Sequence, residues 1–442
     1  MPKPTAHFRC FRGCAGAWPL TQAIYRCPTC DGLLEVAHDR AALAQTSADE
    51  WRARFDARWS PTAREIPMPS GVWSKREWVA PEVPDDCIVS TGEGMTALYP
   101  AKLLAKQSGI RELYVKQCGT THTGSFKDLG MTVLVSVVNQ AVRQGSLKVR
   151  AIACASTGDT SAALAAYGAA AGLPVVVLLP RGMVSVGQLV QPLAHGARVL
   201  ALDTDFDGCM RIVRELAARG LVYLANSMNP LRIEGQKTVA IEIAQQLGWQ
   251  APDWVVIPSG NLGNAAALYA GFAMARDLGL VDRLPRLCVA QAANADPMYR
   301  AFMKGQTEVT PVVAKATQAS AIRIGNPVSA PRAMAALKAM NGVVEEATEQ
   351  ELADACAKAD RTGLYACPHT GVGLACAMKL RARGVIAESE RVVVVSTASA
   401  LKFTEFKLGY HEKKLPEVDS TLANEPIALP ADVETVVQHL PP

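Results

Sequence analysis

The chain has 442 residues, which is too long for one small core and favours two or three domains. Apolar residues make up 49% and charged residues 19% of it, as is typical of a globular protein with a large core. The net charge of +4 is too small to favour binding to nucleic acid or to a membrane surface. No apolar run reaches the roughly 18 residues of a membrane span. The first residues lack the apolar stretch of a secretion signal, so we expect a cytoplasmic protein.

The N-terminal segment, residues 1–90, carries four clustered cysteines. Cys10 and Cys14 have C-x3-C spacing, and Cys27 and Cys30 have C-x2-C spacing. Two such knuckles can converge on a zinc ion, which we expect to be structural and remote from any chemistry. A ribbon that folds without metal has the same spacing, and a disulfide is disfavoured in a reducing cytoplasm. The other eight cysteines are isolated, mostly among apolar residues, as expected of buried thiols.

A helix is predicted next, over ADEWRARFDARW (residues 48–59), followed by a proline-rich, loop-like stretch (61–84). From about residue 88, short β-branched runs alternate with alanine-rich helical segments. The runs at 175–179 and 392–395 are continuously apolar, which is typical of strands covered by helices on both faces. This alternation predicts an α/β fold with parallel sheets, whose ligands bind at the carboxyl ends of strands. Residues 416–442 are expected to form a loosely held, loop-like tail.

Lys127 lies in THTGSFKDLGM, directly before a helical pattern. Small hydroxyl residues and glycines precede it, whereas a surface lysine usually lies among other charges. A lysine at a helix start is also at the unfavourable end of the helix dipole. That positive field and partial burial both lower the pKa of an amine, as required of a lysine that forms an imine with a carbonyl group. We therefore interpret Lys127 as a reactive amine.

Three further polar motifs follow predicted strands. STGDTSAA (156–163) crowds hydroxyls and a carboxylate at a helix start, which indicates either an N-cap or a loop that holds an anion. SGNLGN (259–264) predicts a backbone cradle for a phosphate, although a tight turn capped by Asn261 has the same pattern. Its spacing is that of neither a Walker loop nor a dinucleotide fingerprint. Ser396 and Thr397 end the four-valine strand, where hydroxyls can also cap a turn.

Five motifs together resemble a known family: HTGSFKD, STGDTSAA, NSMNPLRIEGQKT (226–238), SGNLGN and STASALKF occur in the order found in the threonine synthase family. From about residue 70 to about residue 415 the chain resembles this family of fold-type II pyridoxal-phosphate enzymes, and above all its plant-type branch. The resemblance implies two parallel-sheet α/β domains with the cofactor between them, in addition to an N-terminal segment like a zinc ribbon. The implied units are the N-terminal segment (1–90), a large cofactor-binding domain (91–126 and 227–415), a small domain (127–226) and the tail (416–442).

The same resemblance implies a role for each cofactor-binding residue. Lys127 would carry pyridoxal phosphate covalently and move protons, with Phe126 beside the ring. Thr397 would meet the pyridine nitrogen as a neutral hydroxyl, and Asp159 would approach the ring hydroxyl through a shared proton. The cofactor phosphate would be held by Gly260, Asn261, Leu262, Gly263 and Asn264.

Substrate recognition is implied for a second group of residues. The carboxylate and phosphate of the substrate would be held by Ser156, Thr157, Thr160, Asn226, Ser227 and Arg232. Of these, Arg232 is the natural bidentate partner of a phosphate. The alternative for Arg232 is a surface arginine paired with Glu234.

The implied activity is that of a carbon–oxygen lyase of threonine biosynthesis, which converts O-phospho-L-homoserine and water into L-threonine and phosphate. The family also suggests a homodimer and, as in plants, S-adenosylmethionine as an effector. Ser399-Ala400 departs from the His-Gly pair usual in the plant branch. One alternative is a cysteate synthase-like reaction on O-phosphoserine. Another is a non-catalytic paralogue, which would be expected to have lost Lys127.

Overall fold

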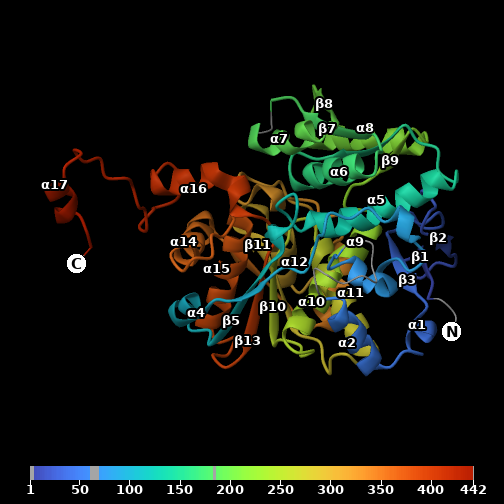
Figure 1. Cartoon of the computed structure of the whole chain (residues 1–442), viewed down its shortest axis with the longest axis horizontal. Coiled ribbons are helices and arrows are strands. Elements are labelled where there is room, and N and C mark those ends of the chain that lie inside the picture. Colours follow the sequence, from blue (N-terminus) through green and yellow to red (C-terminus); the bar gives the residue numbers. More distant parts are fainter. Residues whose placement is uncertain (1–3, 60–68, 183–185, 442) are drawn as a thin grey trace.

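The computed structural model describes residues 4–59, 69–182 and 186–441 (Figure 1). Within these residues lie three sheets, two of them built mainly from parallel strands and flanked by helices. These two sheets confirm the predicted α/β fold. In the described part of the chain, no helix combines the length and the apolarity needed to cross a bilayer.

The first sheet is small, antiparallel and N-terminal, with the strand order β2-β1-β3. Its strands are β1 (Ala6–Cys10), β2 (Trp18–Pro19) and β3 (Leu34–His38). Two helices follow, α1 (Arg40–Leu43) and α2 (Ala48–Ala57). The predicted helix over 48–59 is thus confirmed, and it begins at a capping box in which Ser47 and Glu50 bond each other's backbone N–H groups.

The proline-rich stretch is partly helical, which differs from the predicted loop. Residues 60–68 lie outside the described residues, but η1 (Trp73–Lys75) and α3 (Arg76–Val79) follow them. Trp73 and Trp78 are fully buried, and Trp73 donates a hydrogen bond from its indole N–H to the Thr132 hydroxyl at 2.7 Å. The tryptophans therefore draw this segment into the core, which composition alone did not indicate.

The largest sheet has six strands in the order β12-β11-β10-β13-β5-β4, of which only β4 runs antiparallel. The valines of β13 enter alternate cores, with Val393 and Val395 on one face and Val392 and Val394 on the other. Burial on both faces explains the continuously apolar run. The strands are β4 (Leu98–Pro100), β5 (Glu112–Gln117), β10 (Trp254–Pro258), β11 (Arg286–Ala292), β12 (Val343–Ala347) and β13 (Arg391–Ser396).

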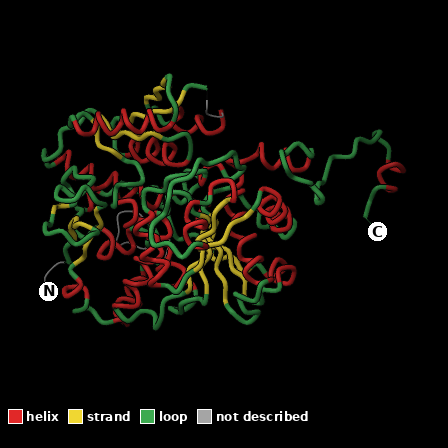
Figure 2. Tube along the Cα trace, turned by 180° about the vertical axis from the view of Figure 1, so that it is seen from behind, coloured by secondary structure: helices red, strands yellow, loops and turns green. Residues whose placement is uncertain are grey.

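Helices cover both faces of this sheet, as Figure 2 shows from behind. The helices whose side chains share a core with Val393 include α10 (Thr238–Gln246), α11 (Gly263–Asp277), α12 (Pro297–Met303) and α13 (Ala330–Ala339). Those that share a core with Val392 are α4 (Lys102–Ser108), α14 (Glu349–Asp360) and α15 (Pro368–Ala382).

The third sheet has four parallel strands in the order β8-β7-β6-β9, so β9 is an edge strand. Its strands are β6 (Ala151–Ala155), β7 (Val175–Pro180), β8 (Arg198–Leu202) and β9 (Val222–Leu224). The neighbouring helices are α6 (Asp159–Ala170), α7 (Val186–Ala194) and α8 (Phe206–Ala218). This sheet and these helices form the upper part of the molecule in Figure 1.

Two helices cross closely between the parallel sheets. α5 (Lys127–Arg143) packs against α6 and against α9 (Leu231–Gln236). A Cβ atom on Gly235 would lie 1.6 Å from the Leu129 carbonyl oxygen, and one on Gly130 would lie 2.8 Å from that of Arg232. Since only glycine allows this approach, these two residues bring the first turn of α5 beside the first turn of α9.

The C-terminal tail stays on the body after α16 (Thr404–His411) as far as Leu422, whose carbonyl accepts a hydrogen bond from Arg361. Beyond that region it extends away from the body (Figure 1). Against the expectation of a loop throughout, it contains the short helix α17 (Val433–Gln438), which begins where the Asp432 side chain accepts a hydrogen bond from Thr435 N–H. No residue of α17 is buried.

Candidate active site

Lys127 is the first residue of α5, and the loop before it is joined to the end of β13. Phe126 N–H donates to the Thr397 carbonyl at 2.9 Å, and Ser399 N–H donates to the Gly124 carbonyl at 2.8 Å. Two motifs that lie far apart in the sequence are thus joined by a short antiparallel bridge; they are HTGSFKD and STASALKF. This bridge brings the buried Thr397 beside Phe126, the residue before Lys127.

The side chain of Lys127 lies beside an aromatic ring and near charged groups of both signs. Its ammonium nitrogen is 4.1 Å from the centre of the Phe126 ring. The pKa of Lys127 is lowered to about 7, mainly by burial and also by the nearby charges of Arg232 and Lys402, whereas the charge of Asp159 opposes the shift. The geometry therefore gives this amine a substantial neutral, nucleophilic fraction near neutral pH.

Asp159 and Lys402 join the ends of the two parallel sheets. Asp159 opens α6, after β6 of the small sheet, whereas Lys402 lies in η6 (Ala400–Phe403), after β13 of the large sheet. The Lys402 amine is 2.7 Å from an Asp159 carboxylate oxygen and also donates to the Thr123 carbonyl at 3.1 Å. Burial opposes ionisation of Asp159, yet the charge and hydrogen bond of Lys402 lower its pKa below the usual value. Asp159 is therefore a carboxylate.

His369, in the first turn of α15, is a further ionisable group near this pair. Its Nε2 atom accepts a hydrogen bond from Ala321 N–H at 3.0 Å, and its ring lies edge-on to Phe403. Burial lowers the pKa of His369 to about 4, an effect that the carboxylate of Asp159 opposes and the charge of Lys127 reinforces. The imidazole is neutral at neutral pH.

The SGNLGN segment forms a tight turn between β10 and α11. Leu262 adopts a left-handed conformation (φ 65°) and does not cap α11. In the first turn of α11, Ala265 N–H donates to the Asn264 side chain at 3.0 Å, which leaves the N–H groups of Gly263 and Asn264 without a side-chain partner among the described residues. The Asn264 side chain also accepts from the Ser259 hydroxyl at 2.8 Å and donates to the Pro258 carbonyl. The alternative of a turn capped by Asn261 does not hold, because that side chain accepts from Val328 N–H at 3.4 Å. The turn has the free donors that an anion needs.

Another segment packs directly against the turn at residues 259–264. A Cβ atom on Gly260 would lie 2.7 Å from Cα of Ile322, in the same short turn η5 (Ser320–Ile322) whose Ala321 N–H bonds His369. Gly260, Asn261, Leu262, Gly263 and Asn264 thus lie together beside the strand ends. No hydrogen bond among the described residues joins them directly to the Lys127 side chain.

Arg232 is buried in α9, with 4% of its surface exposed. Its Nη atoms donate to the Thr160 hydroxyl at 3.3 Å and to the Ala225 carbonyl at 3.4 Å, while Nε is buried without a partner. Burial lowers the pKa of Arg232 to about 10. Glu234 lies elsewhere, in a cluster with Lys237 and His38, so the alternative of a surface Arg232–Glu234 pair is wrong.

The other residues predicted to bind the substrate follow β6 and β9, and some of their side chains form hydrogen bonds to the backbone. The Asn226 amide bonds both N–H and C=O of Ala155, which holds the end of β9 to β6. The Ser156 hydroxyl accepts from the N–H groups of Gly158 and Ser161, as an N-cap would. The half-buried Thr157 and Ser227 lie at the ends of β6 and β9 respectively.

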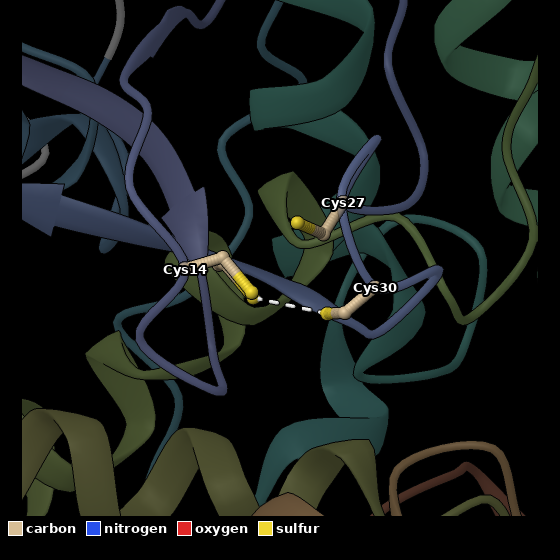
Figure 3. Close-up of side chains that lie close together, drawn as sticks. Cys14, Cys27 and Cys30 are labelled. Carbon is tan, nitrogen blue, oxygen red and sulfur yellow. Dashed lines mark hydrogen bonds between the residues drawn. The ribbon is translucent and has the colours of Figure 1, made fainter.

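The four cysteines of the N-terminal segment converge, as Figure 3 shows for Cys14, Cys27 and Cys30. All four sulfur atoms lie within 4.8 Å of one another, and none forms a disulfide. That the cluster is remote from the chemistry stays a prediction, while a neighbouring residue of the same segment contacts β9. Tyr25, two residues before Cys27, accepts a hydrogen bond from Leu224 N–H at 2.8 Å, beside Asn226.

Sequence reasoning missed Lys402 and His369 as members of the site. Lys402 lies inside the quoted STASALKF motif, but nothing in a single sequence pairs it with Asp159, 243 positions earlier. His369 follows a proline at a helix start, in ACPHTGVG, a pattern that resembles an ordinary N-terminus. A polar residue next to a strand or helix end was the signal available for both.

Comparisons with known proteins agree on one family. The model of pyridoxal-phosphate dependent enzymes matches residues 89–398. Threonine synthase 2, chloroplastic, of Arabidopsis thaliana is 54% identical over 426 residues, which are 96% of this chain and 82% of that protein. The threonine synthase of Methanocaldococcus jannaschii is 38% identical and 98% of each chain is covered.

Solved structures show the same fold at lower identity. Escherichia coli threonine synthase has a TM-score of 0.66 and 20% identity, covering 97% of this chain and 94% of its own. Threonine synthase of Brucella melitensis with bound pyridoxal phosphate has a TM-score of 0.67 and 19% identity. The match covers 91% of this chain and 90% of the Brucella melitensis chain. The fold-type II architecture expected from the five motifs is thereby confirmed.

Proposed function

The chain belongs to the threonine synthase family of pyridoxal-phosphate-dependent enzymes, and from this premise we propose that it converts O-phospho-L-homoserine and water into L-threonine and phosphate. The observation that carries the substrate assignment is the buried Arg232 guanidinium with an unpartnered Nε, close enough to Lys127 to lower its pKa. A reactive amine and a fixed cation side by side suit a substrate that carries a dianionic leaving group.

The residues of the site fit pyridoxal phosphate. Lys127 is an amine with a lowered pKa, and the uncapped N-terminus of α11 offers free N–H groups to a phosphate. We propose that Lys127 holds the cofactor covalently, that residues 260–264 hold its phosphate, and that Phe126 lies beside its ring. When bound, the cofactor supplies an electron sink for negative charge at the substrate's carbon atoms.

Asp159 and Thr397 are proposed to set the state of the cofactor ring. Thr397 offers a neutral hydroxyl, as expected from the sequence. Asp159 is ionised and forms an ion pair with Lys402. The ammonium of Lys402 therefore balances the negative charge of Asp159, which reduces the need for a proton shared between Asp159 and the ring hydroxyl. Lys402 is thereby a positioning residue for Asp159.

Lys127 is proposed to move the protons of the reaction. Its neutral amine would take the proton from Cα of the substrate and release it before it takes one from Cβ. Phosphate would leave Cγ with the electron pair of the carbon–oxygen bond, and Cγ and Cα would each receive a proton back before the product is released. Water adds at Cβ. The charges of Arg232 and Lys402 keep the amine's pKa close to neutral pH, so that it can both accept and release a proton.

Arg232 is proposed to hold the substrate phosphate, helped by Thr160, whose hydroxyl already faces the guanidinium. Ser156, Thr157 and Ser227 are proposed to hold the carboxylate. Asn226 acts through the backbone, because its amide is occupied by Ala155. These roles place the phosphate and the carboxylate of the substrate at the ends of β6 and β9.

Phosphate release from O-phospho-L-homoserine and from O-phosphoserine tests the proposal. We expect turnover of the first with L-threonine as product, and at least roughly 10-fold lower efficiency with the second, which lacks one methylene. Preference for O-phosphoserine would establish the cysteate synthase-like reaction. No reaction with either, in enzyme with bound cofactor, would favour the non-catalytic paralogue.

The lowered pKa of Lys127 predicts how cofactor attachment depends on pH. The neutral amine is the nucleophile, so the attachment rate should rise with pH and level off above about 7, because the pKa of Lys127 is about 7. The rate is measured as the growth of visible absorbance when pyridoxal phosphate is added to the apoenzyme between about pH 5.5 and 9. A rate that keeps rising toward pH 10 would show an ordinary lysine pKa.

The remaining proposals come from the family resemblance. They are a large domain of residues 91–126 and 227–415, a small domain of 127–226, a homodimer, activation by S-adenosylmethionine, and a cytoplasmic location. The relative from Arabidopsis thaliana is named as chloroplastic. Light scattering of the holoenzyme tests the dimer, and the rate of phosphate release with and without S-adenosylmethionine tests the effector.

A further inference from the structure

We propose that Cys10, Cys14, Cys27 and Cys30 bind one zinc ion, and that the zinc-bound N-terminal sheet holds the substrate arm in place. The substrate arm is residues 224–234, from the end of β9 into α9, and it includes Asn226 and Arg232. The zinc site stands on the cysteine geometry alone. The consequence for catalysis rests on the proposed function.

The geometry of the four sulfurs suits a tetrahedral ion. They lie within 4.8 Å of one another, and those of Cys10 and Cys30 are 3.5 Å apart. A tetrahedral zinc ion with four bonds of about 2.3 Å requires sulfur–sulfur distances of about 3.8 Å. Each knuckle turns through a residue with positive φ, Gly13 at 84° and Asp31 at 51°. Both turns therefore direct their cysteines toward the same point.

One contact joins the second knuckle to the start of the substrate arm. The Tyr25 hydroxyl accepts a hydrogen bond from Leu224 N–H at 2.8 Å, and its ring meets that of Tyr223 edge-on, with centres 5.5 Å apart. The Tyr223 hydroxyl in turn accepts from the Asn229 amide at 3.0 Å. Because β9 is an edge strand, Tyr25 supplies the partner that Leu224 N–H would otherwise lack.

A second contact joins the sheet to the end of the arm. His38, the last residue of β3, lies 2.6 Å from a Glu234 carboxylate oxygen, and Lys237 completes the cluster at 2.9 Å from the imidazole. All three side chains are almost fully buried. Since Glu234 is two residues after Arg232 in α9, this buried cluster fixes the helix that carries the guanidinium.

A third contact joins the same sheet to the other side of the site. Buried Arg332, in α13, donates to the Leu34 carbonyl in β3. The residue before α13, Ser329, donates its N–H to the Asn261 carbonyl at 3.1 Å, in the proposed cofactor cradle. The N-terminal segment therefore touches β9 through Tyr25, and α9 and α13 through β3. If the cysteine knuckles become disordered without metal, the substrate arm loses its contacts with Tyr25 at Leu224 and with His38 at Glu234.

Metal content tests the site directly. Freshly purified, reduced holoenzyme should contain one zinc per chain, and Cys14→Ser should lose it. Cys87→Ser is the matched control, because Cys87 is a buried cysteine outside the cluster, and this variant should retain zinc. Absence of zinc from the reduced protein, or iron in its place, would overturn the site.

Hydrogen exchange and kinetics test the support of the arm, using Tyr25→Phe so that the four ligands stay intact. Amide exchange in residues 222–234 should become roughly 10-fold faster, as one lost buried hydrogen bond implies, while α15 keeps its rate. KM for O-phospho-L-homoserine should rise by a similar factor, with the visible absorbance of bound cofactor unchanged. Exchange that is unchanged, or faster in α15 as well, would overturn the positioning role. The exchange result holds whether or not this substrate is turned over.

Discussion

Replacing Lys127 with alanine is expected to abolish turnover, with a loss of at least roughly 10³-fold, because we propose that the same amine anchors the cofactor and moves protons of the substrate. The visible absorbance of the bound cofactor should disappear with it. Thermal stability of the apoenzyme should not fall, since the charge of Lys127 stands at a helix N-terminus beside Arg232 and Lys402. Absorption spectra, phosphate release and thermal melting measure these three outcomes.

Lys106→Ala is the matched control for this variant, because Lys106 is exposed on α4. It should keep the absorbance and the activity of the unmodified enzyme. If the alanine variant at position 127 retained the visible absorbance after dialysis, another amine would hold the cofactor, and the assignment of Lys127 would be wrong.

Replacing Arg232 with alanine is expected to lower kcat/KM for O-phospho-L-homoserine by roughly 10²-fold or more, through loss of the positioned cation. Cofactor absorbance should persist, because the proposed cradle for the cofactor phosphate is the separate turn at 260–264. Arg232→Lys keeps the charge but loses the two-pronged geometry, so it should recover only part of the efficiency. Steady-state kinetics and a titration with pyridoxal phosphate separate the two effects.

The control for Arg232 is Arg219→Ala, since Arg219 lies exposed at the end of α8 and pairs with Glu215. It should leave kcat/KM unchanged. Near-normal efficiency of the Arg232→Ala enzyme would remove this residue from the site. Loss of bound cofactor in that variant would instead show that α9 also supports the cradle.

The sequence by itself determined the fold class and the positions of the polar motifs. Runs such as Val392 to Val395 are apolar at every position, as expected of a strand that is buried on both faces, and several motifs directly follow such runs. Local order along the chain therefore sufficed to predict parallel sheets, a reactive Lys127 and a phosphate cradle at residues 259–264.

Only the tertiary structure decided which of these residues meet and in what charge state. Gly130 and Gly235 let α5 and α9 touch, which buries Arg232 beside Lys127 rather than beside Glu234, and no spacing in the sequence encodes that contact. The Asp159–Lys402 pair likewise joins strand ends of two different sheets. The physical reason is that burial and the distance between charges set a pKa, and both are properties of the packed chain rather than of its local order.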